Sequence, residues 1–378
     1  MKKTYIDTAM ERIAPDLILK GGNVVDVFSG RVIKADVIIK DGIICGVGSY
    51  SGENEQDVSG KYIMPGFIDS HVHIESSMTQ PSEYAKAVMP HGITTVIADP
   101  HEITNVCGED GLEFMLKSAK NIPLDVNLML PSCVPATPFE HTGANLDAKT
   151  TQKLAPKFFG IGEMMNYPGI VSGDDETLGK LCLDIIDGHA PLLSGHELDA
   201  YASAGIKTDH ECSVVEEMTE KISKGMYILL REGTLSLDVA KLIKGVTPYT
   251  LRRCAFCTDD RFVGEIIRDG SIDHCIRKAV SLGLNNIDAI IMATLNACEI
   301  YGMKNKGAIA PSYVADIVVA DDLNLSSISQ VYKNGKLVCE NGKALFECET
   351  VDNSKVTNTV HLPKISADFF KTDVKDKF

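Results

Sequence analysis

Downstream of residue 65 the chain alternates short apolar stretches with longer segments of helical periodicity. Such alternation is typical of repeated strand–helix units, whose strands pair in parallel. Eight units fit into roughly 240 residues, the size expected of a (β/α)8 barrel. We therefore predict an α/β fold with a TIM-type barrel. The strands are expected to end near His73, Asp99, Cys133, Glu163, His189, His210, Glu232 and Asp259.

Short β-type runs lie on both sides of this repeating region. Turn-forming dipeptides such as Asp41-Gly42 and Asn334-Gly335 separate them, and these dipeptides favour hairpins. The two flanks are therefore expected to build one small β-sandwich. The predicted domains are a sandwich of residues 15–60 and 308–348, a barrel of residues 61–307 and a polar tail of residues 349–378.

The composition restricts the partners and the compartment. A net charge of −15 disfavours nucleic acid and anionic membranes as partners and favours a cytoplasmic protein. No apolar run reaches the length of a membrane span. The eleven cysteines are scattered and odd in number, which suits reduced thiols in a cytoplasmic protein better than a disulfide framework.

The first strand after Pro65 carries two histidines, His71 and His73, near its end. Residues two apart on a strand point to the same side, so both imidazoles can hold one metal ion. Two histidines alone could equally form ordinary hydrogen bonds. Metal-type side chains at the ends of four later strands favour the metal site: Glu163, His189, His210 and Asp259.

The carboxyl ends of barrel strands meet at one face, where barrel enzymes place their active sites. Four histidines and two carboxylates at that face would bind two divalent ions, with one carboxylate bridging them. Such a site lowers the pKa of a bound water and yields a hydroxide nucleophile, while an aspartate moves its proton.

The sequence also contains parts of a second zinc signature. Glu75 completes an HxE, and Cys254 with Cys257 forms a CxxC, the elements of the zinc nucleobase deaminases. Arg253 stands where that signature has proline, and roughly 180 residues separate the two elements. We therefore interpret these cysteines as packing residues.

Several sequence strings resemble one family. The small β unit beside a barrel, the HVH after PGFID and the late aspartate are similar to the amidohydrolase superfamily, and the finer strings resemble bacterial adenine deaminases. These strings are PGFIDSHVHIESS (65–77), ADPHEITNV (98–106), GEMMNYPGIVSGD (162–174), DGHAP (187–191), LSG (193–195), AGIKTDHEC (204–212), REGT (231–234) and CTDDR (257–261).

The resemblance implies a role for each matching residue. His71 and His73 would hold one metal, His189 and His210 the other, and Glu163 would bridge them in place of the carboxylated lysine of many relatives. Asp259 would bind metal and carry the proton to the leaving ammonia.

The resemblance also implies how substrate is held. The segment 99–102 is similar to the purine-contacting loop, with Glu102 the candidate for protonating a ring nitrogen. Asp99 and His101 could instead support the site. Arg231 and Glu232 could contact substrate or pair across the barrel mouth.

The reaction implied is hydrolysis of adenine to hypoxanthine and ammonia. Manganese(II) or iron(II) would serve, and zinc is possible, because affinity order does not select among them. A homo-oligomer, commonly a dimer, is expected. Related deaminases are usually longer at the C-terminus, so this chain is a short form or a piece. Two alternatives stay open: another cyclic amidohydrolase or heterocycle deaminase, and a non-catalytic metal-binding fragment.

Overall fold

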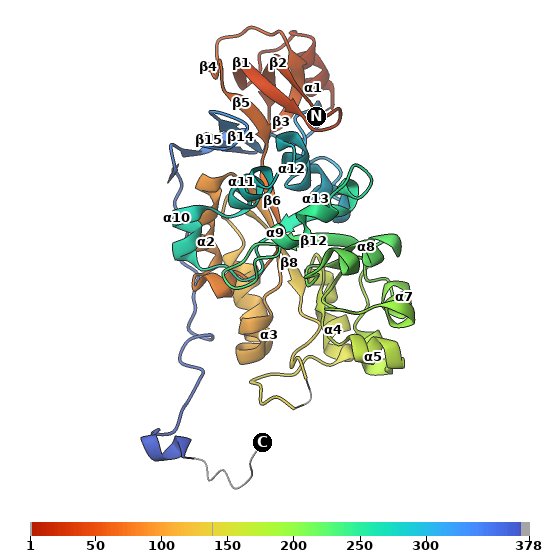
Figure 1. Ribbon diagram of the computed structural model, residues 1–378. Helices are drawn as coiled ribbons and strands as arrows, with labels where there is room; N and C mark the ends of the chain where they lie inside the picture. The colour runs from red at the N-terminus through yellow and green to blue at the C-terminus, as the bar shows by residue number, and fades with distance from the viewer. Residues whose placement is uncertain (1, 138, 372–378) are drawn as a thin grey trace.

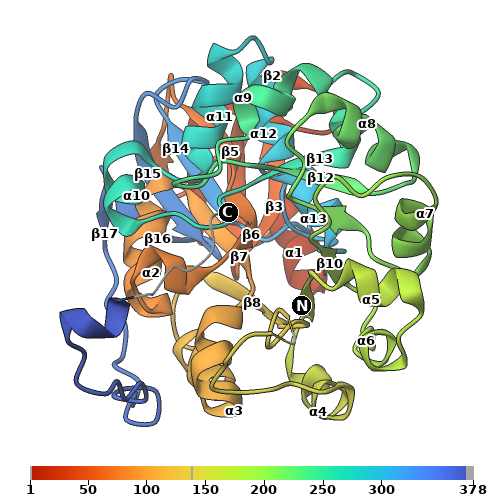
Figure 2. The same ribbon diagram turned by 60° about the horizontal axis from the view of Figure 1, so that its bottom comes forward.

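Eight parallel strands form the centre of the computed structural model, which describes residues 2–137 and 139–371 (Figures 1 and 2). Five strands pair in the order β10-β9-β8-β7-β6 and three in the order β11-β12-β13. Their bounds are β6 (Phe67–Val72), β7 (Ile93–Ala98), β8 (Asp125–Leu130), β9 (Gly160–Met164), β10 (Ile186–Gly188), β11 (Thr208–Asp209), β12 (Tyr227–Arg231) and β13 (Cys254–Cys257).

Backbone contacts join the two groups of strands into a barrel. The Asp259 N–H donates to His71 O at 3.0 Å, and the His73 N–H donates to Asp259 O at 3.1 Å, which links the ends of β13 and β6. On the opposite side, the Lys207 N–H donates to Ile186 O at 3.3 Å, beside β10 and β11. The predicted (β/α)8 barrel is confirmed.

Helices surround the strands, as the view toward the carboxyl ends of the strands shows (Figure 2). Local sequence explains several helix starts. Asp147 caps α4 by accepting a hydrogen bond from the Thr150 N–H, and acidic residues in the first turn of α8 suit its dipole. The helices that follow the barrel strands are α2 (Pro81–Val88), α3 (His101–Ser118), α4 (Ala148–Leu154), α5 (Tyr167–Ser172), α6 (Asp175–Gly179), α7 (Gly195–Ser203), α8 (Val215–Ser223), α9 (Val239–Leu242), α10 (Val263–Asp269), α11 (Ile272–Ser281), α12 (Asn286–Met292) and α13 (Leu295–Ile300).

A sheet at the amino ends of the barrel strands takes strands from both ends of the chain (Figure 1). Its order is β17-β16-β15-β14-β5-β1-β2-β3, and β4 pairs with β1. The bounds are β1 (Leu17–Asp26), β2 (Arg31–Lys40), β3 (Ile43–Gly48), β4 (Glu55–Asp57), β5 (Tyr62–Pro65), β14 (Ile317–Ala320), β15 (Ile328–Lys333), β16 (Lys336–Glu340) and β17 (Lys343–Ala344).

This sheet differs from the predicted sandwich in one respect. Strand β5 pairs with both β1 and β14, so the strands form one continuous sheet instead of two. The sheet curls until Ile44 donates to Tyr313 O, and residues such as Val37 and Ile317 pack inside the curl. The predicted domain limits at 60/61 and 307/308 stay a prediction.

The chain passes from sheet to barrel across Gly66. A Cβ at that position would lie 2.3 Å from Thr94 Oγ1, so the close approach to β7 requires glycine.

The tail runs from the sheet along the outside of the barrel toward the carboxyl ends of the strands (Figure 1). Lys355 Nζ pairs with Asp110 of α3 at 2.8 Å. The last seven residues of the predicted tail, 372–378, lie outside the described residues. Within the described ranges, no helix has both the length and the hydropathy needed to cross a bilayer.

A buried ion cluster supports the end of β11. Lys221 of α8 is fully buried, and its Nζ contacts Asp209 Oδ2 at 3.0 Å and Glu217 Oε1 at 2.6 Å. Its Nζ also donates to Ala190 O at 2.7 Å. Because Asp209 precedes His210, this cluster holds the strand end that carries a candidate metal ligand.

Replacing Lys221 with methionine is expected to reduce the free energy of unfolding by about 3–5 kcal/mol, because two buried carboxylates lose their cation. Urea titration followed by circular dichroism measures the change. Lys224→Met is the control, because Lys224 pairs with Asp199 near solvent and should change stability by about 1 kcal/mol or less. Equal losses in both variants would contradict this role of Lys221.

Candidate metal centre

The six residues expected to bind metal lie together at the carboxyl ends of the barrel strands. His71 lies on β6 and Glu163 on β9. His73, His189 and His210 directly follow β6, β10 and β11, and Asp259 lies two residues after the end of β13. Each strand is pinned on both sides by its neighbours, so the ligand positions are set by the barrel. All except His189 are buried.

One half of the cluster surrounds His73. Its Nε2 lies 3.1 Å from His71 Nε2, 3.4 Å from Glu163 Oε1 and 3.2 Å from Asp259 Oδ1. His73 Nδ1 contacts Asp99 O at 2.8 Å, which fixes the orientation of the ring. His71, His73, Glu163 and Asp259 therefore direct four ligand atoms toward a common point.

The other half uses the second oxygen of the same glutamate. Glu163 Oε2 lies 2.6 Å from His189 Nδ1 and 3.2 Å from His210 Nε2. The rings of His210 and His71 are stacked with centroids 4.0 Å apart, so the two halves touch. Glu163 is thus placed to bridge two ions, one on each side.

These donors fit divalent metal ions. Imidazole nitrogens and carboxylate oxygens are the ligands that zinc, iron and manganese accept, and ligands around an ion bound at about 2.1 Å lie roughly 3 Å apart. Among the described residues, the sets of three side chains that could hold one ion include His71 with His73 and Glu163, and Glu163 with His189 and His210. The buried Nδ1 of His71 and of His210 has no hydrogen-bond partner among the described residues.

Contacts within the cluster favour the ionised carboxylate of Glu163 and the charged imidazole of His71. Burial would raise the pKa of the Glu163 carboxyl, but hydrogen bonds from His101, His189 and His210 hold it well below its usual range. Burial would lower the pKa of His71, but Asp187 and Asp259 raise it to about 10. Because metal-bound histidine must be neutral, a divalent cation would replace the extra imidazole proton of His71 and take over its charge.

Asp99 lies under the bridging glutamate. Its Oδ2 accepts a hydrogen bond from the Glu163 N–H at 2.9 Å, and its side chain is buried. The carboxylate faces the β9 backbone, which suits the supporting role expected as the alternative, and the expected contact with substrate stays a prediction. The adjacent Gly162 allows this approach, since a Cβ there would lie 2.2 Å from Asp99 Oδ2.

Gly162→Ala is expected to displace Asp99 and Glu163, reduce metal content and destabilise the fold by about 1–3 kcal/mol. Atomic emission spectrometry and thermal unfolding measure these effects. Gly264→Ala is the matched control, because nothing lies within 4 Å of a Cβ there and the site is helical. Unchanged metal content in the Gly162 variant would contradict the contact.

Glu102 and His101 border the first half of the cluster from the first turn of α3. His101 Nδ1 lies 3.2 Å from Glu163 Oε1, and Glu102 Oε2 lies 3.5 Å from His73 Nδ1. The Glu102 side chain is about one third exposed, at 36%. Burial raises the pKa of its carboxyl, but His73 and His101 outweigh this effect and lower it overall.

The neighbours Arg231 and Glu232 point to opposite sides of the barrel wall, as alternation along a strand requires. Arg231 faces the cluster, where its Nη1 lies 3.0 Å from Asp259 Oδ2. Glu232 is buried and pairs with Lys278 of α11 instead. This ion pair agrees with the pairing alternative for Glu232, and its contact with substrate stays a prediction.

Two acidic residues near the cluster had no role assigned from the sequence. Glu211 pairs with Arg231 and lies 3.8 Å from His189 Nδ1. Asp187 Oδ2 lies 3.9 Å from His71 Nδ1 and accepts a hydrogen bond from Tyr301 at 3.1 Å. Glu211 directly follows His210, and Asp187 lies close before His189, and these positions were the signal available in the sequence. The sequence contains no such signal for Tyr301.

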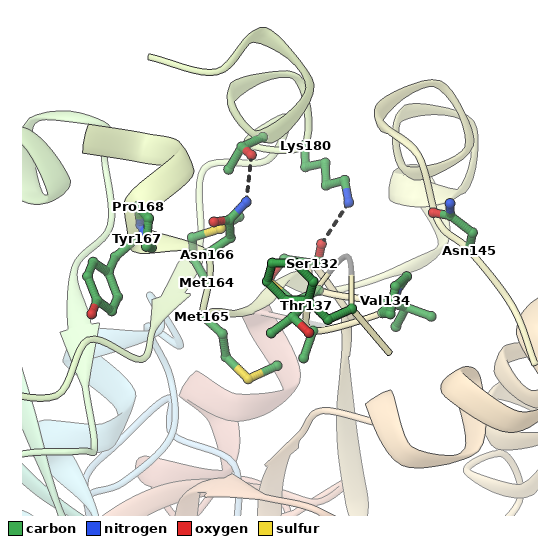
Figure 3. A pocket seen from close by; sticks show the side chains of 15 residues that line it. Ser132, Val134, Thr137, Asn145, Met164, Met165, Asn166, Tyr167, Pro168 and Lys180 are labelled. Carbon is green, nitrogen blue, oxygen red and sulfur yellow. Dashed lines mark hydrogen bonds between the residues drawn. The ribbon is translucent and has the colours of Figure 1, made fainter. Parts of the chain in front are cut away.

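A cavity of about 520 Å³ lies between the segments that follow β8 and β9, and its lining residues do not include the six candidate metal ligands (Figure 3). Met164 and Met165, which follow Glu163 in the sequence, line it. Lys180 Nζ donates to Ser132 O at 3.1 Å at its edge, and Ser132 Oγ donates to Glu163 O at 2.6 Å. The cavity wall is thus tied to the backbone of the bridging glutamate.

Comparison with known proteins gives a consistent result. The sequence pattern of the Amidohydrolase family matches residues 62–338. An adenine deaminase of Clostridium acetobutylicum is 50% identical over 369 residues, which cover 96% of this chain and 65% of that protein. Adenine deaminase 2 of Desulfotalea psychrophila is 48% identical over 380 residues, covering 99% of this chain and 66% of that protein. The chain thus spans about two thirds of the length of these relatives.

Solved structures share the fold at low sequence identity. A beta-aspartyl dipeptidase of Fervidobacterium islandicum superimposes with a TM-score of 0.63 at 20% identity, covering 89% of this chain and 98% of the other. An enamidase superimposes with a TM-score of 0.62 at 18% identity, covering 88% of this chain and 97% of the other. These similarities concern the fold.

Proposed function

Because the chain belongs to the amidohydrolase family, we propose that it hydrolyses adenine to hypoxanthine and ammonia. The observation that carries this proposal is the arrangement of two histidine pairs around the two oxygens of Glu163, in a chain about half identical to adenine deaminases. The chain covers only part of the length of those relatives, so the proposal concerns the residues of this chain.

His71, His73 and Asp259 would hold one divalent ion, His189 and His210 the other, and Glu163 both. When bound, such ions lower the pKa of a water toward neutrality and so supply a hydroxide nucleophile. The family membership and the donor set support divalent ions as cofactors. We assign manganese(II) or iron(II) as the working metals, with zinc as the third candidate.

Asp259 is the proposed proton carrier at the leaving group. Burial would raise the pKa of its carboxyl, but His71 and His73 hold it well below the usual range, so the carboxylate is ionised and can accept a proton. It would take a proton from the oxygen that attacks C6 and give it to the amine. The C–N bond then breaks and ammonia leaves.

Glu102 is the proposed proton carrier at the purine ring. It is ionised before substrate binds, so it would take the other proton of the attacking water and pass it to a ring nitrogen. The two protons of water then end on the ring and on ammonia, and the reaction balances. His101 stays a candidate for orienting Glu102, since its Nε2 lies 3.5 Å from Glu102 Oε1.

The remaining expectations belong to the same proposal. The substrate is a small molecule, the reaction takes place in the cytoplasm, and the working form is a homo-oligomer, a dimer. Sedimentation velocity of the metal-loaded chain tests the last of these.

The proposal is tested by measuring ammonia release from adenine after separate loading with manganese(II), iron(II) and zinc under reducing conditions. Metal-dependent release of equal amounts of ammonia and hypoxanthine is the expected result. Ammonia from another amino-heterocycle but none from adenine would identify a different deaminase. No release from any substrate, with two tightly bound ions per chain, would identify a non-catalytic metal-binding fragment.

A further inference from the structure

We infer that Arg231 is a positioning residue that holds the Asp259 carboxylate in the one orientation useful for proton transfer; this inference rests on the proposed function of the site. Arg231 is the last residue of β12 and Asp259 follows β13, and the two strands are neighbours. The sequence had left Arg231 as either a substrate contact or a pairing residue.

The guanidinium of Arg231 is already occupied by three carboxylates. Its Nη1 contacts Asp259 Oδ2 at 3.0 Å, its Nε contacts Asp238 Oδ2 at 3.1 Å, and its Nη2 contacts Glu211 Oε2 at 3.3 Å. Only 9% of the side chain is exposed. A guanidinium engaged on three sides has little capacity left for substrate, so its contacts favour a positioning role.

The backbone of Asp259 is fixed independently of its side chain. Its φ of 57° lies in the left-handed region, which non-glycine residues seldom adopt. Two hydrogen bonds with β6, to His71 O and from the His73 N–H, hold this conformation. The position of Cα is therefore set by the barrel seam, and the remaining freedom is rotation of the side chain.

Arg231 removes that freedom by binding one carboxylate oxygen. With Oδ2 on Arg231, Oδ1 faces the cluster at 3.6 Å from His71 Nε2 and 3.2 Å from His73 Nε2. Asp259 Oδ2 thus contacts the Arg231 cation, and Asp259 Oδ1 faces the candidate metal ligands. A neutral side chain at position 231 would leave both oxygens able to turn toward the cluster.

The other two acids hold Arg231 in place. Asp238 also pairs with Lys241 at 2.7 Å, which anchors it to the helix outside β12. Glu211 lies between Arg231 and the second histidine pair, 3.6 Å from His210 Nε2. Arg231 therefore links the Asp259 side of the cluster to the His210 side, and one guanidinium orients an acid on each.

The test compares Arg231→Met, Arg231→Lys and Arg231→Ala with the metal-loaded wild-type chain. For Arg231→Met we expect kcat for adenine to fall about 100-fold through misplacement of the proton carrier, with KM changed less than about threefold. Metal content should stay at the wild-type value. Lysine reaches a single carboxylate, so Arg231→Lys should lose about tenfold.

Chemical rescue and a matched control separate positioning from general damage. Guanidinium at non-denaturing concentration should restore the kcat of Arg231→Ala roughly tenfold and saturably, because it can occupy the vacated space. Arg261→Met is the control: Arg261 is also buried, but it donates to the backbone oxygens of Glu232 and Gly270. The Arg261→Met substitution should lower stability and leave kcat within about twofold of the wild-type value.

A crystal structure of manganese-loaded Arg231→Met gives a readout that does not depend on turnover. A rotated Asp259 carboxylate supports the inference, and an unchanged one overturns it. A raised KM with unchanged kcat would also overturn it, because Arg231 would then contact substrate.

The inference and the proposed function can fail separately. Wild-type chain that releases no ammonia from adenine would refute the function, and the orientation of Asp259 in the crystal would still decide the role of Arg231. If the methionine variant does not fold, Arg231→Lys carries both measurements, with the same outcomes supporting or overturning the inference.

Discussion

An Asp259→Asn variant is expected to turn over adenine about 10²- to 10⁴-fold more slowly than the wild-type chain, the range for loss of a positioned acid–base group. Asparagine keeps the shape of the side chain and its contact with Arg231, but its amide cannot accept the proton of the attacking water. Stopped assays of ammonia release measure the change.

Metal binding separates this effect from simple loss of a ligand. Five other residues contribute to the cluster, so Asp259→Asn should retain most of its metal when analysed by atomic emission. Asp199→Asn is the control, because Asp199 pairs with Lys224 on the surface and should leave turnover unchanged. Undiminished turnover in Asp259→Asn would remove this residue from its proposed role.

Replacing Glu163 with glutamine is expected to abolish turnover by a different route. Both carboxylate oxygens face histidine nitrogens, and the amide offers only one oxygen. Removing a residue that merely orients a ligand weakens metal binding about 10- to 100-fold. Replacing the shared ligand Glu163 should therefore weaken metal binding more than about 100-fold.

Competition with a chelator of known affinity measures that loss. Glu113→Gln serves as the matched control, since Glu113 pairs with Lys117 at the surface of α3. The two variants should therefore differ in kind: Asp259→Asn retains metal but turns over adenine slowly, and Glu163→Gln loses both metal and turnover. Retention of two ions by Glu163→Gln would show that the carboxylate does not bridge them.

The barrel was predictable because its signal is local. Strands such as β7 and β13 are short, largely apolar runs followed at once by a polar residue, and such runs can be located one by one in the sequence. The topology then brings His71, Glu163 and His210 to one face without further information. The union of the two flanks in one β unit was predicted, but its form as a single sheet was not, because it depends on β5 pairing with both β1 and β14 and the sequence pattern does not specify strand partners.

The details around the cluster depend on contacts that a linear pattern does not contain. Asp99 supports Glu163 through a backbone hydrogen bond between strands that are not neighbours, and Tyr301 reaches Asp187 across 114 positions. The direction of Glu232 was within reach, because alternation along β12 turns it away once Arg231 faces inward. The rule of strand alternation was available from the sequence, but Arg231 and Glu232 were treated as equally able to contact substrate.

The contacts between β6 and β13 affect the order in which parts of the chain can fold during synthesis. The Thr258 N–H donates to Asp69 Oδ1 across 189 positions of the sequence, beside the candidate metal ligands His71 and Asp259. A nascent chain that has produced His71 and His73 therefore lacks the partner segment until nearly all eight strands have been synthesised. Contacts of such long sequence separation form late and slowly. The histidine pair expected to hold one metal ion is therefore complete in sequence long before the contact that places Asp259 against it can form.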